Sequence, residues 1–115
     1  MRAHAWGMLA EYLCAFVLLL KGYSILALRH RSYAGEIDII AARGRMLAFI
    51  EVKARRNEAE ALESVTAEKQ RRIARGAEAF IATHARYAQH DLRFDVMMVT
   101  SLWKISHLTD AWRVQ

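Results

Sequence analysis

Two apolar stretches in the first half of the chain each contain charged residues. The first stretch holds Glu36 and Asp38, and the second holds Glu51 and Lys53. Charged side chains in such stretches are costly to bury unless they are paired, bind a metal or perform chemistry. Two neighbouring carboxylates repel each other, and a hard divalent cation such as Mg²⁺ or Mn²⁺ between them removes that repulsion. The pattern therefore predicts a metal-dependent nuclease-type site.

Each residue of such a site would have its own role. A metal held by carboxylates polarises the scissile phosphate and acidifies a bound water. Lys53, two residues beyond Glu51, would orient the attacking water or stabilise the charge that develops on the phosphate. Glu36 would be a further ligand or would hold water. The alternative is an ordinary cross-strand cluster of ion pairs on an exposed face, against which the apolar neighbours Ile40 and Phe49 argue.

The site depends on the register of the hairpin that the two stretches would form. Side chains alternate between faces along a strand, and directly opposed residues point the same way. A loop of two residues (43–44) or of four residues (43–46) leaves Asp38, Glu51 and Lys53 on one face. The four-residue loop pairs Asp38 directly with Glu51, whereas a three-residue loop would split the set unless a β-bulge restored it. We therefore predict an even register or a bulge.

Hydrophobic periodicity predicts helices and strands in the order α-β-β-β-α-β-β. The strands are apolar on both faces apart from their charged positions, which is typical of a sheet covered by helices on both sides. Ile37 and Ile39 are predicted to share one face, with Ile40 and Asp38 on the other. The segment 29–31, Arg-His-Arg, indicates an exposed basic loop. The predicted elements are a helix over 4–21, strands over 23–28, 37–42 and 46–52, a loop or short helical turn over 57–64, a helix from an N-cap at Thr66 to about residue 88, and strands over 92–100 and 103–108.

The chain of 115 residues predicts one domain over 1–115, and its 55% of hydrophobic residues can fill a core. Its one cysteine, Cys14, excludes an intramolecular disulfide, so a reducing, cytoplasmic compartment is expected. The apolar run 12–20 is too short for a membrane span, and Glu11 interrupts the longer one, so no membrane contact is expected. No Cys/His spacing indicates zinc.

The net charge of +5 is unevenly distributed. Residues 1–57 hold nine Lys or Arg against four Asp or Glu, whereas residues 58–115 hold eight of each. A local basic excess favours a polyanion such as DNA or RNA, although a solvated basic surface has the same composition. Trp6, Trp103 and Trp112 can stack on bases, but packing is expected instead, with Trp112 near the tail exposed. The candidate nucleic-acid-binding residues are Arg29, Arg31, Arg43, Arg45, Arg55, Arg56, Lys69, Arg71 and Arg72.

With these residues in view, the chain resembles the YraN family of small bacterial proteins. That family resembles archaeal Holliday junction resolvases and belongs to the restriction-endonuclease-like superfamily, whose signature is Asp … (Asp/Glu)-x-Lys. The most specific match is Gly35-Glu36-Ile37-Asp38 followed by Phe49-Ile50-Glu51-Val52-Lys53. The segment 29–31 departs from the family, which more often has an asparagine before a basic residue. The other matching segments are Ala10-Glu11, Lys21-Gly22-Tyr23, Ala54-Arg55, Lys69-Gln70-Arg71-Arg72 and Phe94-Asp95-Val96.

The resemblance implies a restriction-endonuclease-like α/β/α sandwich with a mixed central sheet of about five strands. It implies that Asp38 and Glu51 bind the metal and that Lys53 is the catalytic lysine. It also implies a further acid near the site, Glu11, and a nearby amide, Gln70. From the residues alone, Glu11 can equally face solvent, and Gln70 can be a surface residue of the long helix.

The expected function is a Mg²⁺- or Mn²⁺-dependent endonuclease, similar to a Holliday junction resolvase, that hydrolyses DNA phosphodiester bonds. A resolvase cuts two strands symmetrically, so a homodimer is expected. The alternatives are a non-catalytic nucleic-acid-binding module that retains the nuclease fold, and an adaptor for an acidic protein. Asp95, inside an apolar strand, would either support the site or pair with Arg93.

Overall fold

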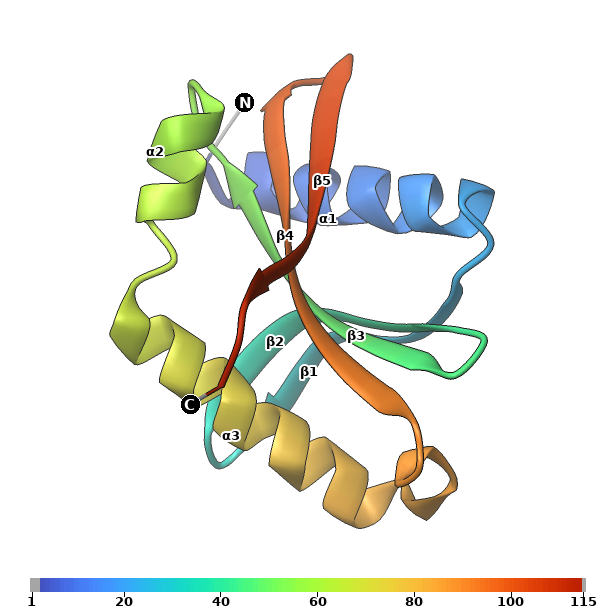
Figure 1. Ribbon diagram of the computed structural model, residues 1–115. Helices are drawn as coiled ribbons and strands as arrows, with labels where there is room; N and C mark the ends of the chain where they lie inside the picture. Colours follow the sequence, from blue (N-terminus) through green and yellow to red (C-terminus); the bar gives the residue numbers. More distant parts are fainter. Residues whose placement is uncertain (1–2, 115) are drawn as a thin grey trace.

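The computed structural model describes residues 3–114 (Figure 1). It is built from three α-helices, one short 3₁₀-helix and five strands within this range. In chain order the elements are α1 (Ala3–Leu20), β1 (Ser24–Ser32), β2 (Gly35–Arg43), β3 (Met46–Ala54), α2 (Glu58–Glu63), α3 (Ala67–Thr83), the 3₁₀-helix η1 (Ala85–Tyr87), β4 (Asp91–Ser101) and β5 (Lys104–Trp112).

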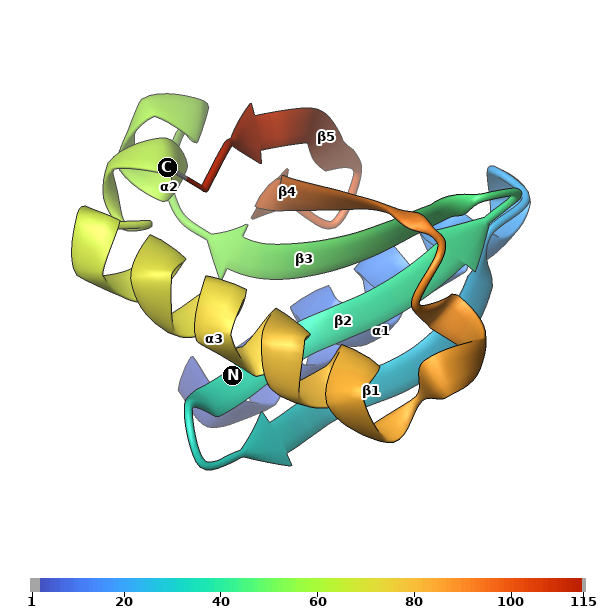
Figure 2. The same cartoon turned by 60° about the horizontal axis from the view of Figure 1, so that its bottom comes forward.

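The five strands form one sheet in the order β1-β2-β3-β4-β5. Neighbouring strands are antiparallel except for β3 and β4, which are parallel. A parallel pair needs a crossover connection, and α2 and α3 supply it. Helix α1 covers one face of the sheet, and α2 and α3 cover the other (Figures 1 and 2). The predicted α/β sandwich with a mixed sheet is therefore confirmed, with α2 as an added short helix.

Alternate residues of the central strands pack into two separate apolar layers. Ile39 and Ile50 are fully buried beneath α1, while Ile40 and Phe49 are fully buried beneath α3. A strand that is apolar at every position is the sequence pattern of a sheet buried on both faces. Asp38, Glu51 and Lys53 are therefore partly or fully buried within a covered sheet, and they do not form the exposed ion-pair cluster.

Helix α1 buries one stripe and leaves another exposed. Ala10, Cys14 and Leu18 pack on the sheet, whereas Phe16 and Leu20 point outward. The helix ends before Gly22, whose φ of +89° is the left-handed conformation that favours glycine at this position. In the part of the chain that the structure describes, no helix combines the length and apolar character that crossing a membrane requires.

Strand β1 is longer than predicted. It continues to Ser32, and the segment 29–31 is paired with β2 rather than forming a basic loop: His30 lies opposite Ile37, and Arg31 lies opposite Glu36. Strand β1 is one of the two edge strands of the sheet, where charged side chains are common because one side of the strand faces solvent. Because of these charged residues, the sequence pattern indicated a loop where the chain forms an edge strand.

Helix α3 begins as predicted and ends earlier. The hydroxyl of Thr66 accepts a hydrogen bond of 3.2 Å from the backbone N–H of Lys69, so Thr66 is the N-cap. The helix stops at Thr83 instead of near residue 88, because His84 leaves the helical conformation with φ −134° and ψ 69°. The short 3₁₀-helix η1 then replaces the predicted last turns. Asn57 caps the short helix α2, so the segment 57–64 adopts the helical alternative.

Candidate functional site

The hairpin of β2 and β3 has the even register that the site requires. Arg43 pairs with Met46 across a two-residue turn, and Gly44 at the start of that turn has a φ of +59°. Extended by one residue beyond the paired segment, this register places Asp38 opposite Glu51. This is the register that we predicted for a four-residue loop over 43–46. Arg43 and Met46 form one further pair, so the turn itself has two residues.

Strands β2 and β3 separate directly beyond Ile39 and Ile50, the last pair of their ladder. Asp38 lies directly beyond this last pair, at the point where the two strands part, which we call the fork. Its Oδ2 accepts a hydrogen bond of 2.8 Å from the backbone N–H of Val52. A backbone donor that loses its strand partner needs another acceptor, and this carboxylate supplies it. Ile37 packs beneath α3 while Ile39 packs beneath α1, so the prediction that they share a face is wrong. The change of face coincides with the point where the strands part.

Glu51 lies between two lysines. Its carboxylate is 2% exposed, and its Oε2 lies 3.9 Å from Lys53 Nζ and 2.9 Å from Lys69 Nζ. The contact to Lys69 is an ion pair by distance but is not aligned as a hydrogen bond, so within residues 3–114 this buried oxygen has no directed donor. Lys69 reaches Glu51 from the first turn of α3. The lysine that was predicted to contact phosphate therefore acts as a counter-ion of the site.

The pKa values of the charged residues in this cluster reflect the proximity of two carboxylates. Burial and the adjacent Glu51 carboxyl raise the pKa of Asp38 to about 8, against the opposing hydrogen bond from Val52. Burial lowers the pKa of Lys53, although Glu51 acts in the other direction. Burial also acts to lower the pKa of Lys69, but its contact with Glu51 outweighs that effect and the pKa is raised.

The donor set fits a hard divalent cation. Glu51 Oε2 is buried without a directed donor, and Asp38 is held close enough to Glu51 for its pKa to rise. A cation between them would neutralise both carboxylates. No group of three or more His, Cys, Asp or Glu side chains converges in the described part of the chain. Two carboxylates would be the contribution of the protein, which suits Mg²⁺ because this ion keeps several waters and takes substrate phosphate oxygens.

A hollow of about 290 Å³ opens at the fork. Its wall combines the start of α1, the ends of the parting strands and the start of α3. Asp38 and Lys53 face it, as does Glu11 of α1. The lining residues are Trp6, Gly7, Ala10, Glu11, Asp38, Val52, Lys53, Ala54, Arg55 and Lys69. The structure therefore brings residues from three distant parts of the sequence to one opening.

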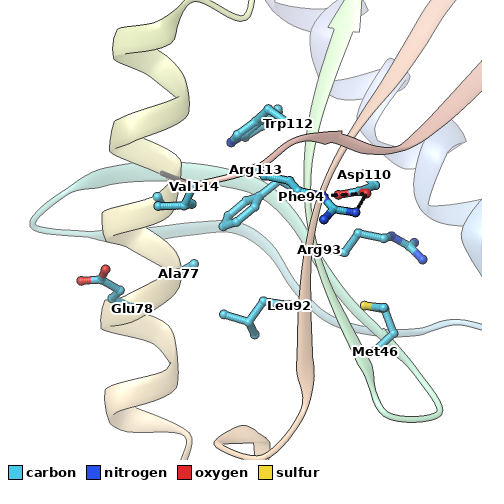
Figure 3. Close-up of a pocket in the computed structure, with 11 residues that line it drawn as sticks. Met46, Ala77, Glu78, Leu92, Arg93, Phe94, Asp110, Trp112, Arg113 and Val114 are labelled. Atoms are coloured by element: carbon cyan, nitrogen blue, oxygen red, sulfur yellow. Dashed lines mark hydrogen bonds and ion pairs between the residues drawn. The ribbon is translucent and has the colours of Figure 1, made fainter.

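A larger hollow of about 540 Å³ lies between α3 and the C-terminal strand (Figure 3). Its wall is mainly apolar, and Leu92, Phe94 and Trp112 contribute to it. Its charged residues include Asp110 and Arg113, which form an ion pair of 2.8 Å with each other. Two carboxylates line it, Glu78 of α3 and Asp110 of β5, but Arg113 pairs with Asp110, so the arrangement differs from the cluster at the fork.

The other predicted site residues differ in their placement. Glu11 lines the hollow, and its Oε1 accepts a hydrogen bond of 2.6 Å from Arg29 Nε, so the carboxylate does not simply face solvent. Glu36 lies outside the hollow and pairs with Arg31 at 3.0 Å on an exposed surface. Gln70 also lies outside, and its side-chain amide donates to the backbone carbonyl of Val65 at 3.2 Å. The structure therefore does not bring Glu36 or Gln70 to the hollow: Glu36 lies on an exposed surface, and the side chain of Gln70 is bonded to the segment between α2 and α3.

The basic candidates divide into two groups. Arg55 lines the hollow, and Arg56 is the next residue in the chain. Arg29 donates a hydrogen bond to Glu11, which also lines the hollow. Arg43 and Arg45 lie at the turn of the hairpin, which is the end of β2 and β3 away from the fork. These two arginines therefore do not lie beside the hollow at the fork.

Arg43 and Arg45 make local contacts instead. Arg43 donates to the backbone carbonyl of Lys21 at 3.1 Å, and Arg45 donates to that of Gln89 at 2.9 Å. On α3, Arg71 lines a different hollow from the one at the fork, and Arg72 is exposed.

Asp95 belongs to a separate buried network. It is fully buried, receives two hydrogen bonds of 2.8 Å from Arg93, and lies 2.8 Å from His107 Nε2. Its position on β4 faces the α1 side of the sheet with Met97 and Val99, and it does not line the hollow. The ion-pair alternative therefore describes Asp95.

Sequence reasoning missed two contributors to the site. Lys69 was predicted only as a nucleic-acid-binding residue, and Trp6 was expected only to pack. The N-cap at Thr66 was a usable signal for Lys69, because it places that residue in the first turn of α3, near the ends of the strands. No local signal places Trp6 beside the fork, since its position depends on how α1 crosses the sheet.

The fold and the site define an α/β sandwich with a carboxylate–lysine cluster where two central strands part. Residues 10–99 match the model of a family described as uncharacterised protein family UPF0102. The chain is 44% identical to a UPF0102 protein of Rhizobium etli over 92% of this chain and 87% of that relative. It is 46% identical to one of Mesorhizobium japonicum, over 85% and 78%, and 42% identical to one of Parvibaculum lavamentivorans, over 96% and 84%.

The chain belongs to the UPF0102 family. This confirms the predicted membership of the YraN family.

Proposed function

We propose that the protein is a Mg²⁺-dependent endonuclease of the restriction-endonuclease-like superfamily, similar to Holliday junction resolvases, that hydrolyses DNA phosphodiester bonds. The observation that carries this proposal is the cluster at the fork. Asp38 and Glu51 lie side by side there, and Lys53 Nζ is 3.9 Å from the second carboxylate. The spacing of these three residues matches the Asp … (Asp/Glu)-x-Lys signature of that superfamily.

The residues of the cluster divide the chemistry. Mg²⁺ or Mn²⁺, held by Asp38 and Glu51, would supply a Lewis acid and an acidified water. Lys53 faces the hollow, where its ammonium would donate to the attacking water or to a phosphate oxygen, and its lowered pKa makes Nζ readier to give up a proton. Lys69 pairs with Glu51 and would balance its charge when no metal is bound. Glu11, held by Arg29, keeps a second negative charge at the wall of the hollow.

The substrate proposal rests on the charge around the opening. Arg55 and Lys69 line the hollow, and Arg56 is exposed beside it. Such a rim suits the phosphates of DNA, which dominate the affinity of nucleic-acid-binding proteins. A DNA-processing role agrees with the cytoplasmic compartment that the single cysteine favours.

A homodimer is part of the proposal, because symmetric cleavage of two strands needs two sites. The outer stripe of α1 supports it. Tyr12, Phe16 and Leu20 are exposed and carry no charge, which suits a two-fold contact between copies. We expect sedimentation velocity to show a dimer that Phe16→Glu converts to a monomer. A monomeric wild-type protein at all accessible concentrations would contradict this part.

The decisive experiment incubates the protein with branched, single-stranded and linear duplex DNA in Mg²⁺ or Mn²⁺. We expect cleavage that EDTA abolishes and that Asp38→Ala and Lys53→Ala each reduce by at least about a hundredfold. Arg45→Ala, at the far turn of the hairpin, is the matched control and should cleave as the wild type does. No cleavage of any substrate, or equal cleavage by the site variants, would overturn the enzymatic proposal.

The same experiment separates the two other functions. DNA binding that weakens with salt but leads to no cleavage would identify a non-catalytic module. The absence of DNA binding at low salt would leave an adaptor for an acidic protein.

A further inference from the structure

The β4–β5 hairpin carries an exposed tryptophan at its tip. Trp103 is 94% exposed, which contradicts the expectation that it packs, while Trp112 stacks on Phe94 with ring centroids 5.4 Å apart rather than being exposed at the tail. An indole ring fully in water is a large apolar surface that a folded chain ordinarily covers. The neighbouring Leu102 is also exposed.

The hairpin that presents Trp103 extends beyond the rest of the sheet (Figure 1). Strand β3 ends at Ala54, which pairs with Val99, whereas β4 continues to Ser101 and turns through residues 102–103. The base of the hairpin is fastened to its surroundings: Ser106 of β5 donates a hydrogen bond of 3.1 Å to Glu58 of α2. The exposed ring is therefore held on a paired hairpin and not on a long loop.

The tip lies at the end of the sheet that contains the candidate site. Lys53 pairs with Met98, and Ser101 follows Met98 three positions along β4, a distance of roughly 10 Å along the strand. A second hollow of about 380 Å³ lies between the site and the hairpin base. It shares Trp6, Ala54 and Arg55 with the hollow at the fork and reaches Val99 and Thr100 of β4.

Positive charge accompanies this path. Lys104 directly follows Trp103 and is exposed, and Arg55 lies between the tip and the fork. Within residues 3–114 neither of these two residues forms an ion pair, whereas Arg56 pairs with Glu60 at 2.9 Å. An aromatic ring flanked by unpaired cations is the combination that binds single-stranded nucleic acid, because bases stack on the ring while cations contact phosphates.

We propose that the tip of the β4–β5 hairpin is a stacking site for an unpaired base, and that Trp103 directs the fork toward DNA that contains unpaired bases beside the scissile phosphate. This inference rests on the proposed function and narrows its substrate to single-stranded, frayed or branched DNA. In intact duplex the bases are stacked on each other, so the indole finds no partner. Lys104 contributes a phosphate contact that does not depend on base pairing.

The test measures binding in EDTA, where no cleavage occurs, with a single-stranded DNA oligonucleotide and a duplex of the same length. Trp103→Ala should weaken single-strand binding about tenfold and change duplex binding by less than about twofold. Trp103→Phe should retain most of the single-strand affinity, because a phenyl ring also stacks. Lys104→Ala should weaken both complexes. Leu92→Ala removes an exposed apolar side chain at the opposite end of β4 and should change neither.

Tryptophan fluorescence supplies a second readout. Single-stranded DNA should quench the emission of the wild type, and Trp103→Phe should remove the larger part of that quenching, with Trp6 at the fork hollow supplying the remainder. Unchanged single-strand binding by Trp103→Ala, or an equal loss on duplex, would overturn the inference while leaving a nuclease intact. A selective loss without any Mg²⁺-dependent cleavage would instead overturn the proposed function and leave the stacking site standing. If neither DNA binds at low salt, both proposals fail.

Discussion

Glu51 has two lysine neighbours, and the two lysines are not equivalent. Lys69 lies 2.9 Å from the carboxylate, and that contact raises its pKa. Lys53 is farther, at 3.9 Å, and burial lowers its pKa. One lysine is therefore a fixed positive charge that balances Glu51, whereas the other is closer to the neutral form that proton transfer needs. The second lysine is the one that matches the superfamily signature.

The Asp38 carboxyl makes stability depend on pH. Its pKa rises from 3.8 to about 8 on folding, so between these values the folded state binds more protons than the unfolded state. The free energy of unfolding of the metal-free protein should therefore decrease as pH rises from about 4 to about 8. Added Mg²⁺ should raise the melting temperature more at pH 8 than at pH 6, because the metal competes with the proton.

Urea unfolding at several pH values, with and without Mg²⁺, checks this expectation. Asp38→Asn cannot titrate and is the control: its stability should lose this pH dependence and its response to Mg²⁺. A Mg²⁺ effect of equal size at both pH values in the wild type would show that Asp38 is not a ligand.

At the level of elements, α3 packs tightly against the sheet at Gly76. A Cβ at this position would lie 3.0 Å from Ile37 Cδ1 and 3.3 Å from its Cγ1. Ile37 belongs to the segment of β2 beyond the fork, so this contact fixes the half of β2 that carries Asp38. The glycine weakens the helix in isolation but permits this approach.

Gly76→Leu should lower the free energy of unfolding by about 1–3 kcal/mol, because the larger side chain overpacks the contact with Ile37. Leucine is a good helix former, so a loss cannot be assigned to helix propensity. Arg72→Leu, at an exposed position of the same helix, is the control and should change stability little. Urea denaturation of both variants measures the difference, and equal stabilities would show that the contact is not tight.

The sequence predicted the elements whose pattern is strong. The apolar stripe of α1 and the continuous apolar runs of β2, β3 and β4 identify a sheet between helices. The end of β1 was missed because the basic segment 29–31 has no apolar alternation, and an edge strand needs none on its solvent side. The end of α3 was predicted too far along the chain because the polar segment after Thr83 has a composition typical of helices.

The site was predictable only as far as strand geometry determines it. The alternation of side chains placed Asp38 with Glu51 and Lys53 once the register was even. The contact from Lys69 depends on the docking of α3 on the sheet, which no local pattern encodes. The same hairpin geometry explains why Arg45 fails as a site residue: a turn lies at the opposite end of a hairpin from its open fork.

For the whole molecule, the basic excess of residues 1–57 does not form a single surface. One group lies at the fork with Arg55 and Arg56, and another at the hairpin turn with Arg43 and Arg45. Phosphate contacts release counterions, so affinity for DNA should fall with salt in proportion to the contacts made. Of these two groups of arginines, only the one at the fork should contribute to the dependence of DNA affinity on salt.

Measured over a range of salt concentrations, the logarithm of affinity against the logarithm of salt should be a straight line for duplex DNA. Arg55→Ala should flatten its slope by about 0.9, the value for one phosphate contact. Arg45→Ala should leave the slope unchanged. The opposite pattern would place DNA on the turn of the hairpin and away from the candidate site.

The hydrogen bond between Asp38 and Val52 makes one backbone amide a reporter of the site. Most amides in the sheet are protected from solvent exchange by neighbouring strands, but the amide of Val52 is held by a side chain. Its exchange rate and its nuclear magnetic resonance shift therefore follow the state of a single carboxylate. Titration of that carboxylate, its capture by a cation, or its replacement by alanine would each be visible at Val52.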